Sequence, residues 1–201
     1  TDGYLGPFEM CSRDEMARIA ARLDSEVLAP DPPPQGVYQS RHLDSRLVYD
    51  LCAHPAIVSR MAAIYGRDLL LWRSHLFLKE PGAAEVPWHQ DTNYWPLEPT
   101  LNISAWVAID DATVENSCVN LIPGSHQLVV PHGPAPEGMV FAEMADMGYV
   151  DTTTSVAMEL RAGEFFLFNE RTVHQSEPNT SGRRRLGLAV RVTTPIVRVD
   201  H

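Results

Sequence analysis

From about residue 69 onward the chain consists of short β-type segments, and this pattern constrains the fold more than any other feature. The segments are rich in β-branched and aromatic residues and are bounded by turn residues, as expected of antiparallel strands. We expect strands at residues 69–79, 86–95, 100–109, 118–122, 156–160, 164–168 and 186–193. Such a series after a helical N-terminal part predicts a mainly β fold, a sandwich or jelly roll.

The first 66 residues favour helices instead. Ser12 and Glu15 have the spacing of a capping box, in which two side chains satisfy free N–H groups at a helix start. Apolar residues then recur at helical spacing from Met16 to Val27, so we expect one buried stripe and a helix end before Pro30. The remaining expectations are a turn-rich entry at 2–8, a proline-rich loop at 31–36, and helices at 44–54 and 55–66.

We treat the 201 residues as one domain, with a helical preface at 1–66 and a β core at 67–201. The stretch from about residue 129 to 154 has no clean period and predicts a lid or a partly mobile loop. The chain begins with Thr1 rather than Met, so its ends indicate nothing about the ends of the native protein.

Charge and cysteine content narrow the class of protein. The chain carries 26 acidic and 16 basic side chains, a net charge of −10, which argues against nucleic acid as a partner. It has no basic amphipathic run, signal peptide or apolar span, which argues against a membrane partner. Cys11, Cys52 and Cys118 are odd in number and widely spaced, as expected of free thiols. We therefore expect a soluble cytoplasmic protein.

Two His-x-Asp triplets stand out among the eight histidines. In His42-Leu43-Asp44 the aspartate stands where a helix N-cap is expected, and capping explains it without a metal. His89 and Asp91 instead lie in a strand-like run with no helix start nearby. Side chains two residues apart on a strand share a face, so this pair is able to grip one ion.

His174 is the third candidate ligand. Thr172, His174 and Ser176 are polar and share one face by the two-residue period, after an apolar strand. Two imidazoles and one carboxylate with open positions are typical of non-haem Fe(II) oxygenases. The alternative at this point is a hydrogen-bonded His–Asp pair inside a jelly roll.

The last expected strand carries two arginines on one face. Its even positions from 186 to 192 are apolar, whereas Arg185 and Arg191 both fall on the odd, polar face. A guanidinium inside a barrel favours a bidentate carboxylate, which 2-oxoglutarate would provide. The alternative is a sheet facing solvent, or pairing with Glu164 or Glu177. Arg183 and Arg184 are expected to be exposed turn charges.

Taken together, these motifs resemble the phytanoyl-CoA dioxygenase family of Fe(II)/2-oxoglutarate oxygenases. The resemblance lies in residues 88–91, in 105–110 leading to the Ile-Pro-Gly-Ser-His run at 122–126, and in 163–185. Residues 3–8, 41–44 and 72–82 look similar to the branch that contains syringomycin-type aliphatic halogenases. Those halogenases have a small residue in place of the metal carboxylate, whereas this chain has Asp91. The resemblance therefore implies a hydroxylase or related oxidase rather than a halogenase.

The resemblance also implies a double-stranded β-helix (cupin-like) core and a role for individual residues. It implies Fe(II) held by His89, Asp91 and His174, and 2-oxoglutarate and O2 as cosubstrates. The residues expected at the cosubstrate are Arg185 and Ser176 at the distal carboxylate, Trp106 beside it, and His75 and Lys79 on the same side. Candidates for the substrate mouth are Asn93, Tyr94, Asn169 and Arg191, with core packing as the alternative for each.

The implied reaction is hydroxylation, or another oxidation, of an unactivated C–H of a small molecule, typical of natural product biosynthesis, with release of succinate and CO2. An aminoacyl group on a carrier protein is the alternative substrate, although an acidic surface does not suit an acidic carrier protein.

Two alternative functions use the same three ligands. A zinc-type hydrolase would lack a candidate base, and a non-catalytic cupin-like module would keep the metal for structure alone.

Overall fold

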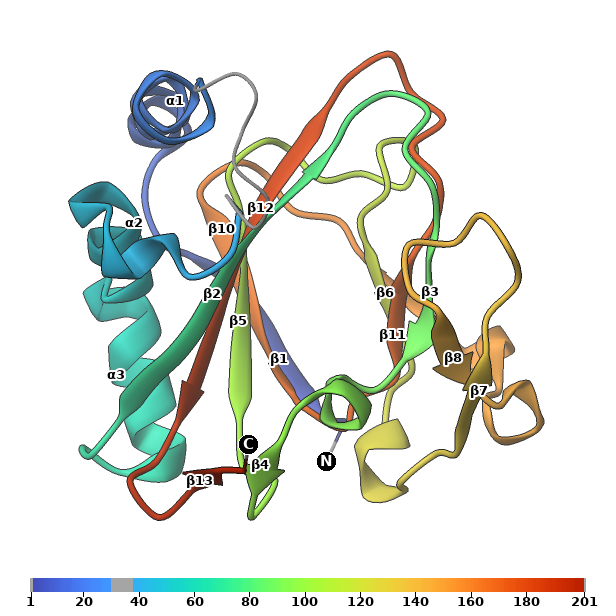
Figure 1. Cartoon of the computed structure of the whole chain (residues 1–201). Coiled ribbons are helices and arrows are strands. Elements are labelled where there is room, and N and C mark those ends of the chain that lie inside the picture. Colours follow the sequence, from blue (N-terminus) through green and yellow to red (C-terminus); the bar gives the residue numbers. More distant parts are fainter. Residues whose placement is uncertain (1, 30–37, 201) are drawn as a thin grey trace.

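The computed structural model describes residues 2–29 and 38–200, and it is built from two antiparallel sheets with helices packed outside one of them (Figure 1). The five-stranded sheet has the order β1-β10-β5-β12-β2, and the four-stranded sheet has the order β3-β11-β6-β9. This arrangement confirms the mainly β prediction and the N-terminal helices. The proline-rich loop expected at 31–36 lies outside the described residues.

The strands of the larger sheet are β1 (Tyr4–Glu9), β2 (Leu70–Lys79), β5 (Ile103–Ala108), β10 (Glu164–Asn169) and β12 (Arg185–Thr193). Those of the smaller sheet are β3 (Val86–His89), β6 (Val119–Leu121), β9 (Val156–Met158) and β11 (His174–Ser176). Two further pairs are β4 (Leu97–Glu98) with β13 (Arg198–Val199), and β7 (His132–Pro134) with β8 (Glu143–Ala145).

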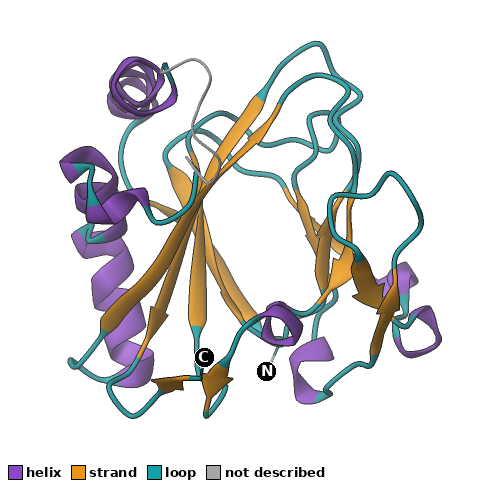
Figure 2. Cartoon of the chain, in the orientation of Figure 1, coloured by secondary structure: helices purple, strands orange, loops and turns teal. Residues whose placement is uncertain are grey.

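Three α-helices cover the outer face of the larger sheet: α1 (Arg13–Leu23), α2 (Arg46–Cys52) and α3 (Pro55–Tyr65) (Figure 2). A π-helical turn η1 (Asp24–Leu28) extends α1, and short 3₁₀ turns are η2 (Arg41–Leu43), η3 (Asp91–Tyr94), η4 (Ser125–Gln127), η5 (Met147–Tyr149) and η6 (Thr152–Thr154). Within 2–29 and 38–200, no single helix is long and apolar enough to cross a membrane. Only α2 and α3 taken together, bent by 47°, pass that test, by length and composition.

The two-residue period of β12 separates the molecule into two compartments. Its even residues, among them Leu186 and Leu188, join a core shared with the helices and with Leu23 and Met61. Its odd residues face the smaller sheet, where Ala189 packs with Trp106, Leu121 and other residues of that inner compartment. One face of the larger sheet therefore anchors the helices, and the other forms the space between the sheets.

Three local expectations are wrong. The segment at 2–8 is not a turn but strand β1, which pairs with β10. The run expected as a strand from 86 to 95 leaves the sheet after His89, because β11 offers only three residues for pairing and the chain then turns into η3. Asp44 does not cap α2. The Ser45 hydroxyl accepts from Val48 N at 3.4 Å, and Asp44 pairs with Arg41 instead.

The stretch at 129–154, expected to be a lid or a partly mobile loop, contains a short hairpin. β7 and β8 pair from His132 opposite Ala145 to Pro134 opposite Glu143. The hairpin is tied to the β3 side of the molecule, because Tyr94 donates its hydroxyl to the Glu143 carbonyl at 2.8 Å and Val140 N donates to the Glu85 carbonyl at 2.9 Å. Its connecting segment therefore lies beside the end of β3.

We expect the core on the helix side to carry much of the stability. Leu188 is 0% exposed in the centre of β12, so Leu188→Ala should lower the free energy of unfolding by roughly 2–5 kcal/mol through lost burial and a cavity. Leu128→Ala is the matched control, because Leu128 is 61% exposed and the change should cost under about 0.5 kcal/mol. Urea unfolding measures both, and equal losses would contradict this core.

Candidate metal centre

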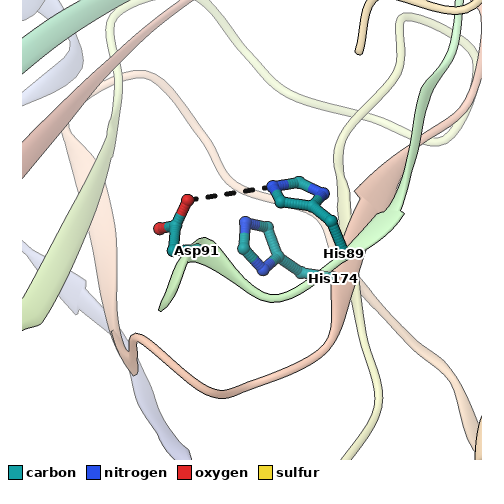
Figure 3. A group of neighbouring side chains, drawn as sticks. All are labelled: His89, Asp91 and His174. Carbon is teal, nitrogen blue, oxygen red and sulfur yellow. Dashed lines mark ion pairs between the residues drawn. The ribbon is translucent and has the colours of Figure 1, made fainter. Parts of the chain in front are cut away.

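His89, Asp91 and His174 form a buried group of potential metal ligands between the sheets (Figure 3). Each offers one donor atom, and the three donor atoms lie within 4.8 Å of one another. His89 Nε2 is 3.8 Å from Asp91 Oδ1, and the centroids of the His89 and His174 rings are 4.1 Å apart. The structure thus brings together the three residues that the sequence singled out, although Asp91 arrives through the η3 turn and not along a strand.

Backbone carbonyls set the orientation of both imidazoles. His89 Nδ1 lies 2.8 Å from the Pro87 carbonyl, and His174 Nδ1 lies 2.8 Å from the Thr172 carbonyl. A carbonyl oxygen only accepts, so Nδ1 carries the proton in each ring and Nε2 keeps its lone pair for an ion. Burial lowers the pKa of both histidines, which keeps the rings in the neutral form that binds metals.

The Asp91 carboxylate fits a cation directly. Asp91 is buried, and its Oδ2 has no hydrogen-bond partner among the described residues. A buried carboxylate oxygen without a partner is costly, and a metal ion removes that cost. Nitrogen and oxygen donors in a two-histidine, one-carboxylate set with open positions suit non-haem Fe(II). The donor set and the orphaned oxygen therefore agree on a metal of this kind.

These three residues line one cavity of about 160 Å³ between the sheets. Other residues that line it include Phe77, Lys79, Trp106, Val140, Phe141, Phe168, Ser176, Arg185 and Arg191. Phe77 and Phe168 come from the inner face of the larger sheet, and Val140 and Phe141 come from the segment joining β7 to β8. The metal group therefore stands in a pocket with apolar walls and a few cationic side chains.

Arg185 is a buried cation for which the described residues provide no close counterion. It is 2% exposed, and within residues 2–29 and 38–200 no carboxylate lies within 4.0 Å of its guanidinium. Its Nε has no described hydrogen-bond partner, and the guanidinium lies 5.1 Å from the Trp106 ring. Burial lowers its pKa to about 10, so it stays charged at neutral pH. An anion in the pocket would satisfy this side chain.

Lys79 is paired within the protein, unlike Arg185. Its ammonium donates to Ser117 Oγ at 2.8 Å, to the Ser176 carbonyl at 3.1 Å and to the Glu177 carbonyl at 2.7 Å. Burial is the main cause that lowers its pKa to about 7, and the nearby Arg185 charge adds to it. Lys79 therefore ties β2 to β11 and contributes charge, whereas its three N–H groups are already used.

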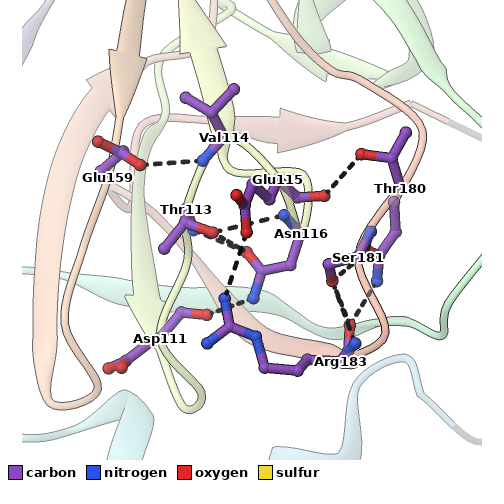
Figure 4. A network of polar contacts seen from close by, with 10 residues as sticks. Asp111, Thr113, Val114, Glu115, Asn116, Glu159, Thr180, Ser181 and Arg183 are labelled. Atoms are coloured by element: carbon purple, nitrogen blue, oxygen red, sulfur yellow. Dashed lines mark hydrogen bonds and ion pairs between the residues drawn. The ribbon is translucent and has the colours of Figure 1, made fainter.

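A polar network outside the pocket holds the loops that carry these residues (Figure 4). Asn116 accepts from Thr113 N at 2.7 Å and donates to the Asp111 carbonyl at 2.7 Å. Thr180 donates through its hydroxyl to the Glu115 carbonyl at 3.2 Å, which joins the loop before β6 to the loop before β12. The network thereby positions the segments that lead to Ser117 and Arg185.

Gly187 leaves room for the Trp106 indole beside β12. A Cβ at position 187 would lie 2.7 Å from Trp106 Cε2 and from Cη2, which is closer than real Cβ atoms approach. A side chain there would force the indole, which lines the pocket beside Arg185, to move. Position 187 is therefore limited to glycine by the indole of Trp106.

The structure places the remaining predicted site residues in different surroundings. Arg191 lines the metal pocket, whereas His75 stacks on Phe77 at 3.9 Å and burial lowers its pKa to about 3. Asn93 is exposed, donates to Glu143 Oε2 at 2.7 Å, and like Tyr94 lies outside the pocket lining. Asn169 lines a separate hollow beside Tyr4.

Sequence reasoning missed two contributors to the site. Phe141 packs its ring 4.9 Å from that of His89, and no period in residues 129–154 signals this. Gln90 donates to the Leu128 and Arg171 carbonyls and so braces the loops behind the ligands. Its position between His89 and Asp91 was the available signal.

Comparison with known proteins agrees with this geometry. The sequence profile described as phytanoyl-CoA dioxygenase (PhyH) matches residues 1–187. A Dictyostelium discoideum protein, phytanoyl-CoA dioxygenase domain-containing protein 1 homolog, is 30% identical over 116 residues, which are 55% of this chain and 41% of that protein. The chain spans about half the length of the curated relatives it matches.

Two solved structures are similar over nearly the whole chain. The apo form of the non-haem monooxygenase ThoJ superposes with a TM-score of 0.87 at 26% identity, covering 99% of this chain and 76% of that one. CytC3 with Fe(II) and α-ketoglutarate, the same compound as 2-oxoglutarate, superposes with a TM-score of 0.74 at 27% identity, covering 98% and 75%. The described fold is therefore shared with a non-haem monooxygenase and with a protein that binds Fe(II) and α-ketoglutarate.

We expect Asp91→Ala to weaken Fe(II) binding at least about a hundredfold, since it removes one of three ligands. Asp44→Ala is the matched control, because Asp44 closes the other His-x-Asp triplet but pairs with Arg41 on the surface, and its variant should bind Fe(II) as the unchanged protein does. Anaerobic calorimetry measures both. Equal affinity of the Asp91→Ala protein would remove Asp91 from the ligand set.

Proposed function

This chain belongs to the phytanoyl-CoA dioxygenase (PhyH) family, and we propose that it is an Fe(II)- and 2-oxoglutarate-dependent oxygenase that hydroxylates an unactivated C–H of a small molecule. The supporting observation is one cavity lined both by the His89–Asp91–His174 group and by Arg185, a buried cation with no carboxylate of the described residues within 4.0 Å. A metal group explains the first, and a carboxylate-bearing cosubstrate explains the second.

The three-residue donor set would leave positions at a bound metal open for the cosubstrate and O2. His89, Asp91 and His174 would hold Fe(II), with Nδ1 of each imidazole fixed by a backbone carbonyl. Bound Fe(II) supplies the redox chemistry that couples O2 and 2-oxoglutarate to C–H oxidation, with release of succinate and CO2. The protein's own part is to fix the ligands, hold the cosubstrate and exclude water.

Arg185 is the proposed anchor of the cosubstrate. Its guanidinium pairs with the distal carboxylate of 2-oxoglutarate in a bidentate manner, and the Ser176 hydroxyl, which lines the same cavity, adds a hydrogen bond. Trp106 flanks the guanidinium and limits the width of the site. The N–H groups of Lys79 already donate to protein atoms, so its contribution to the cosubstrate is positive potential and not a direct hydrogen bond.

The apolar walls keep water from the reacting carbon. Phe77 and Phe168 line the cavity from the larger sheet, and Val140 and Phe141 line it from the β7–β8 connection. A dry cavity strengthens the electrostatic contacts inside it and protects reactive species from side reactions. The β7–β8 hairpin thus takes the role of the lid that the sequence suggested, and Phe141 is its contact with His89.

Hydroxylation is favoured over halogenation by Asp91, because its carboxylate occupies the position that a halide would need. A zinc-type hydrolase lacks a positioned base and leaves Arg185 unexplained. The remaining alternatives are a non-catalytic metal-binding module and an oxygenase that acts on an aminoacyl group tethered to a carrier protein. A free small molecule of the secondary-metabolite type suits the acidic chain better, because carrier proteins are themselves acidic.

The protein with Fe(II), 2-oxoglutarate and O2 should form succinate, slowly without substrate and faster with it. Arg185→Gln should raise the KM for 2-oxoglutarate by at least about tenfold, because charge-assisted hydrogen bonds contribute about 1.5–3 kcal/mol each. Arg183→Gln is the control, since its guanidinium is exposed and only loosely paired with Glu115. Absence of both 2-oxoglutarate binding and succinate from folded, iron-loaded protein would refute the oxygenase.

Gly187→Ala should weaken 2-oxoglutarate binding without touching any ligand. The added methyl displaces the Trp106 indole into the cosubstrate space, so we expect a rise in KM of about tenfold or more with unchanged Fe(II) affinity. Gly182→Ala is the matched control, because a Cβ there meets nothing within 4 Å. Steady-state succinate assays and anaerobic iron titrations separate the two effects, and an unchanged KM would contradict the placement of Trp106.

A further inference from the structure

A second buried arginine lines the metal pocket, and the proposed reaction leaves its charge unused. Arg191 is 7% exposed, and its Nε has no hydrogen-bond partner among the described residues. The guanidinium lies 4.9 Å from the Trp95 ring and 5.8 Å from the Phe77 ring. Nη2 is 3.9 Å from Asp91 Oδ1, which is an ion-pair distance but too long for a hydrogen bond.

Arg191 and Arg185 belong to two different sites on β12. Arg185 stands opposite Lys79 and Arg191 stands opposite Arg73 in the register with β2. Six residues of strand separate their Cα atoms by roughly 20 Å at about 3.3 Å per residue. Their charged neighbours also differ, since Asp91 and Arg73 act on Arg191, whereas Asp110 acts on Arg185. A cosubstrate anchored at Arg185 therefore leaves Arg191 for another ligand.

The surroundings of Arg191 carry excess positive charge once a metal is bound. Asp91 is the one carboxylate of the described residues within 4.0 Å of its guanidinium, and a cation bound by Asp91 would offset much of the negative charge that this carboxylate presents to Arg191. Arg73 faces it across the strand pair, which places like charges opposite each other. A buried cation without a counterion is strongly unfavourable, so an anion beside Arg191 would stabilise the loaded site.

The form of the side chain indicates which anion. A guanidinium presents a planar fork of N–H donors that matches the two oxygens of a carboxylate, and aromatic rings at its faces leave its edge for that contact. The rest of the pocket wall near the metal group is apolar, with Phe77, Val140 and Phe141. This combination suits a molecule with one carboxylate and an apolar body.

We propose that the substrate oxidised at this centre is a carboxylic acid whose carboxylate pairs with Arg191, which places a C–H of its apolar body toward the metal group. This inference rests on the proposed oxygenase function and specifies its substrate class. It also favours a free acid over an acyl group tethered as a thioester, because a thioester has lost that carboxylate charge.

The test uses the full chain loaded with Mn(II) and 2-oxoglutarate in the absence of O2. Calorimetric titration compares carboxylic acids with their primary amides, which match them in shape but carry no charge, from acetate and acetamide to phenylacetate and phenylacetamide. We expect at least one acid to bind about tenfold or more tightly than its amide. Equal affinities in every pair, or no binding by any acid, would overturn the proposal.

Variants assign the preference to Arg191. Arg191→Gln should abolish the preference for acid over amide, and Arg191→Lys, which keeps the charge but not the planar fork, should retain part of it. Arg73→Gln is the matched control, because it makes the same charge change on the neighbouring strand in a side chain that bonds Gln39, and the preference should survive. A preference that persists in Arg191→Gln, or is lost equally in Arg73→Gln, would contradict the assignment.

Two measurements on the same samples separate this inference from the proposed function. Titration with 2-oxoglutarate precedes the acids, and failure of the metal-loaded protein to bind it would count against the oxygenase itself. Binding of 2-oxoglutarate together with no preference for acids would count against the Arg191 inference alone. Thermal melting and Mn(II) affinity of each variant show that it is folded and loaded.

Discussion

The site depends on the pairing of β3 with β11, which sets His89 opposite His174. Residues directly opposite in an antiparallel pair direct their side chains to the same face, and here that face is the interior between the sheets. β3 ends at His89, and the turn that follows swings Asp91 back toward the two imidazoles. A short strand pair and one turn therefore create a three-ligand group from residues far apart in the chain.

The larger sheet supplies the rest of the site through the same alternation. The even residues of β12, among them Leu186 and Leu188, pack against the helices. The odd residues Arg185 and Arg191 lie on the opposite face and line the cavity. Burying two guanidiniums without full protein pairing is costly, and the helix-side core is what allows the sheet to hold them there. The fold thus keeps two buried guanidiniums on the wall of the metal cavity at a cost in stability.

Sequence reasoning succeeded where a pattern was local. The Ser12 cap, the apolar strands and the parity of β12 each follow from neighbouring residues, and the structure shows them. It failed where the partner was remote: β1 pairs with β10 and needs that partner to be a strand, and β7 and β8 are too short to show a period. His89 and Asp91 were predicted as neighbours on a strand. They are neighbours through a turn. The prediction failed because the sequence alone does not show where β11 ends and stops offering hydrogen bonds to β3.

The central claim is that His89, Asp91 and His174 hold iron with an open face that a keto acid can chelate. The most direct measurement is anaerobic absorption spectroscopy of the Fe(II)-loaded protein titrated with 2-oxoglutarate. Chelation of Fe(II) by the keto acid produces a visible charge-transfer band, and we predict that the band saturates at one equivalent and disappears in Asp91→Ala. Absence of the band in the unchanged protein, or an equal band in Asp91→Ala, would contradict the account.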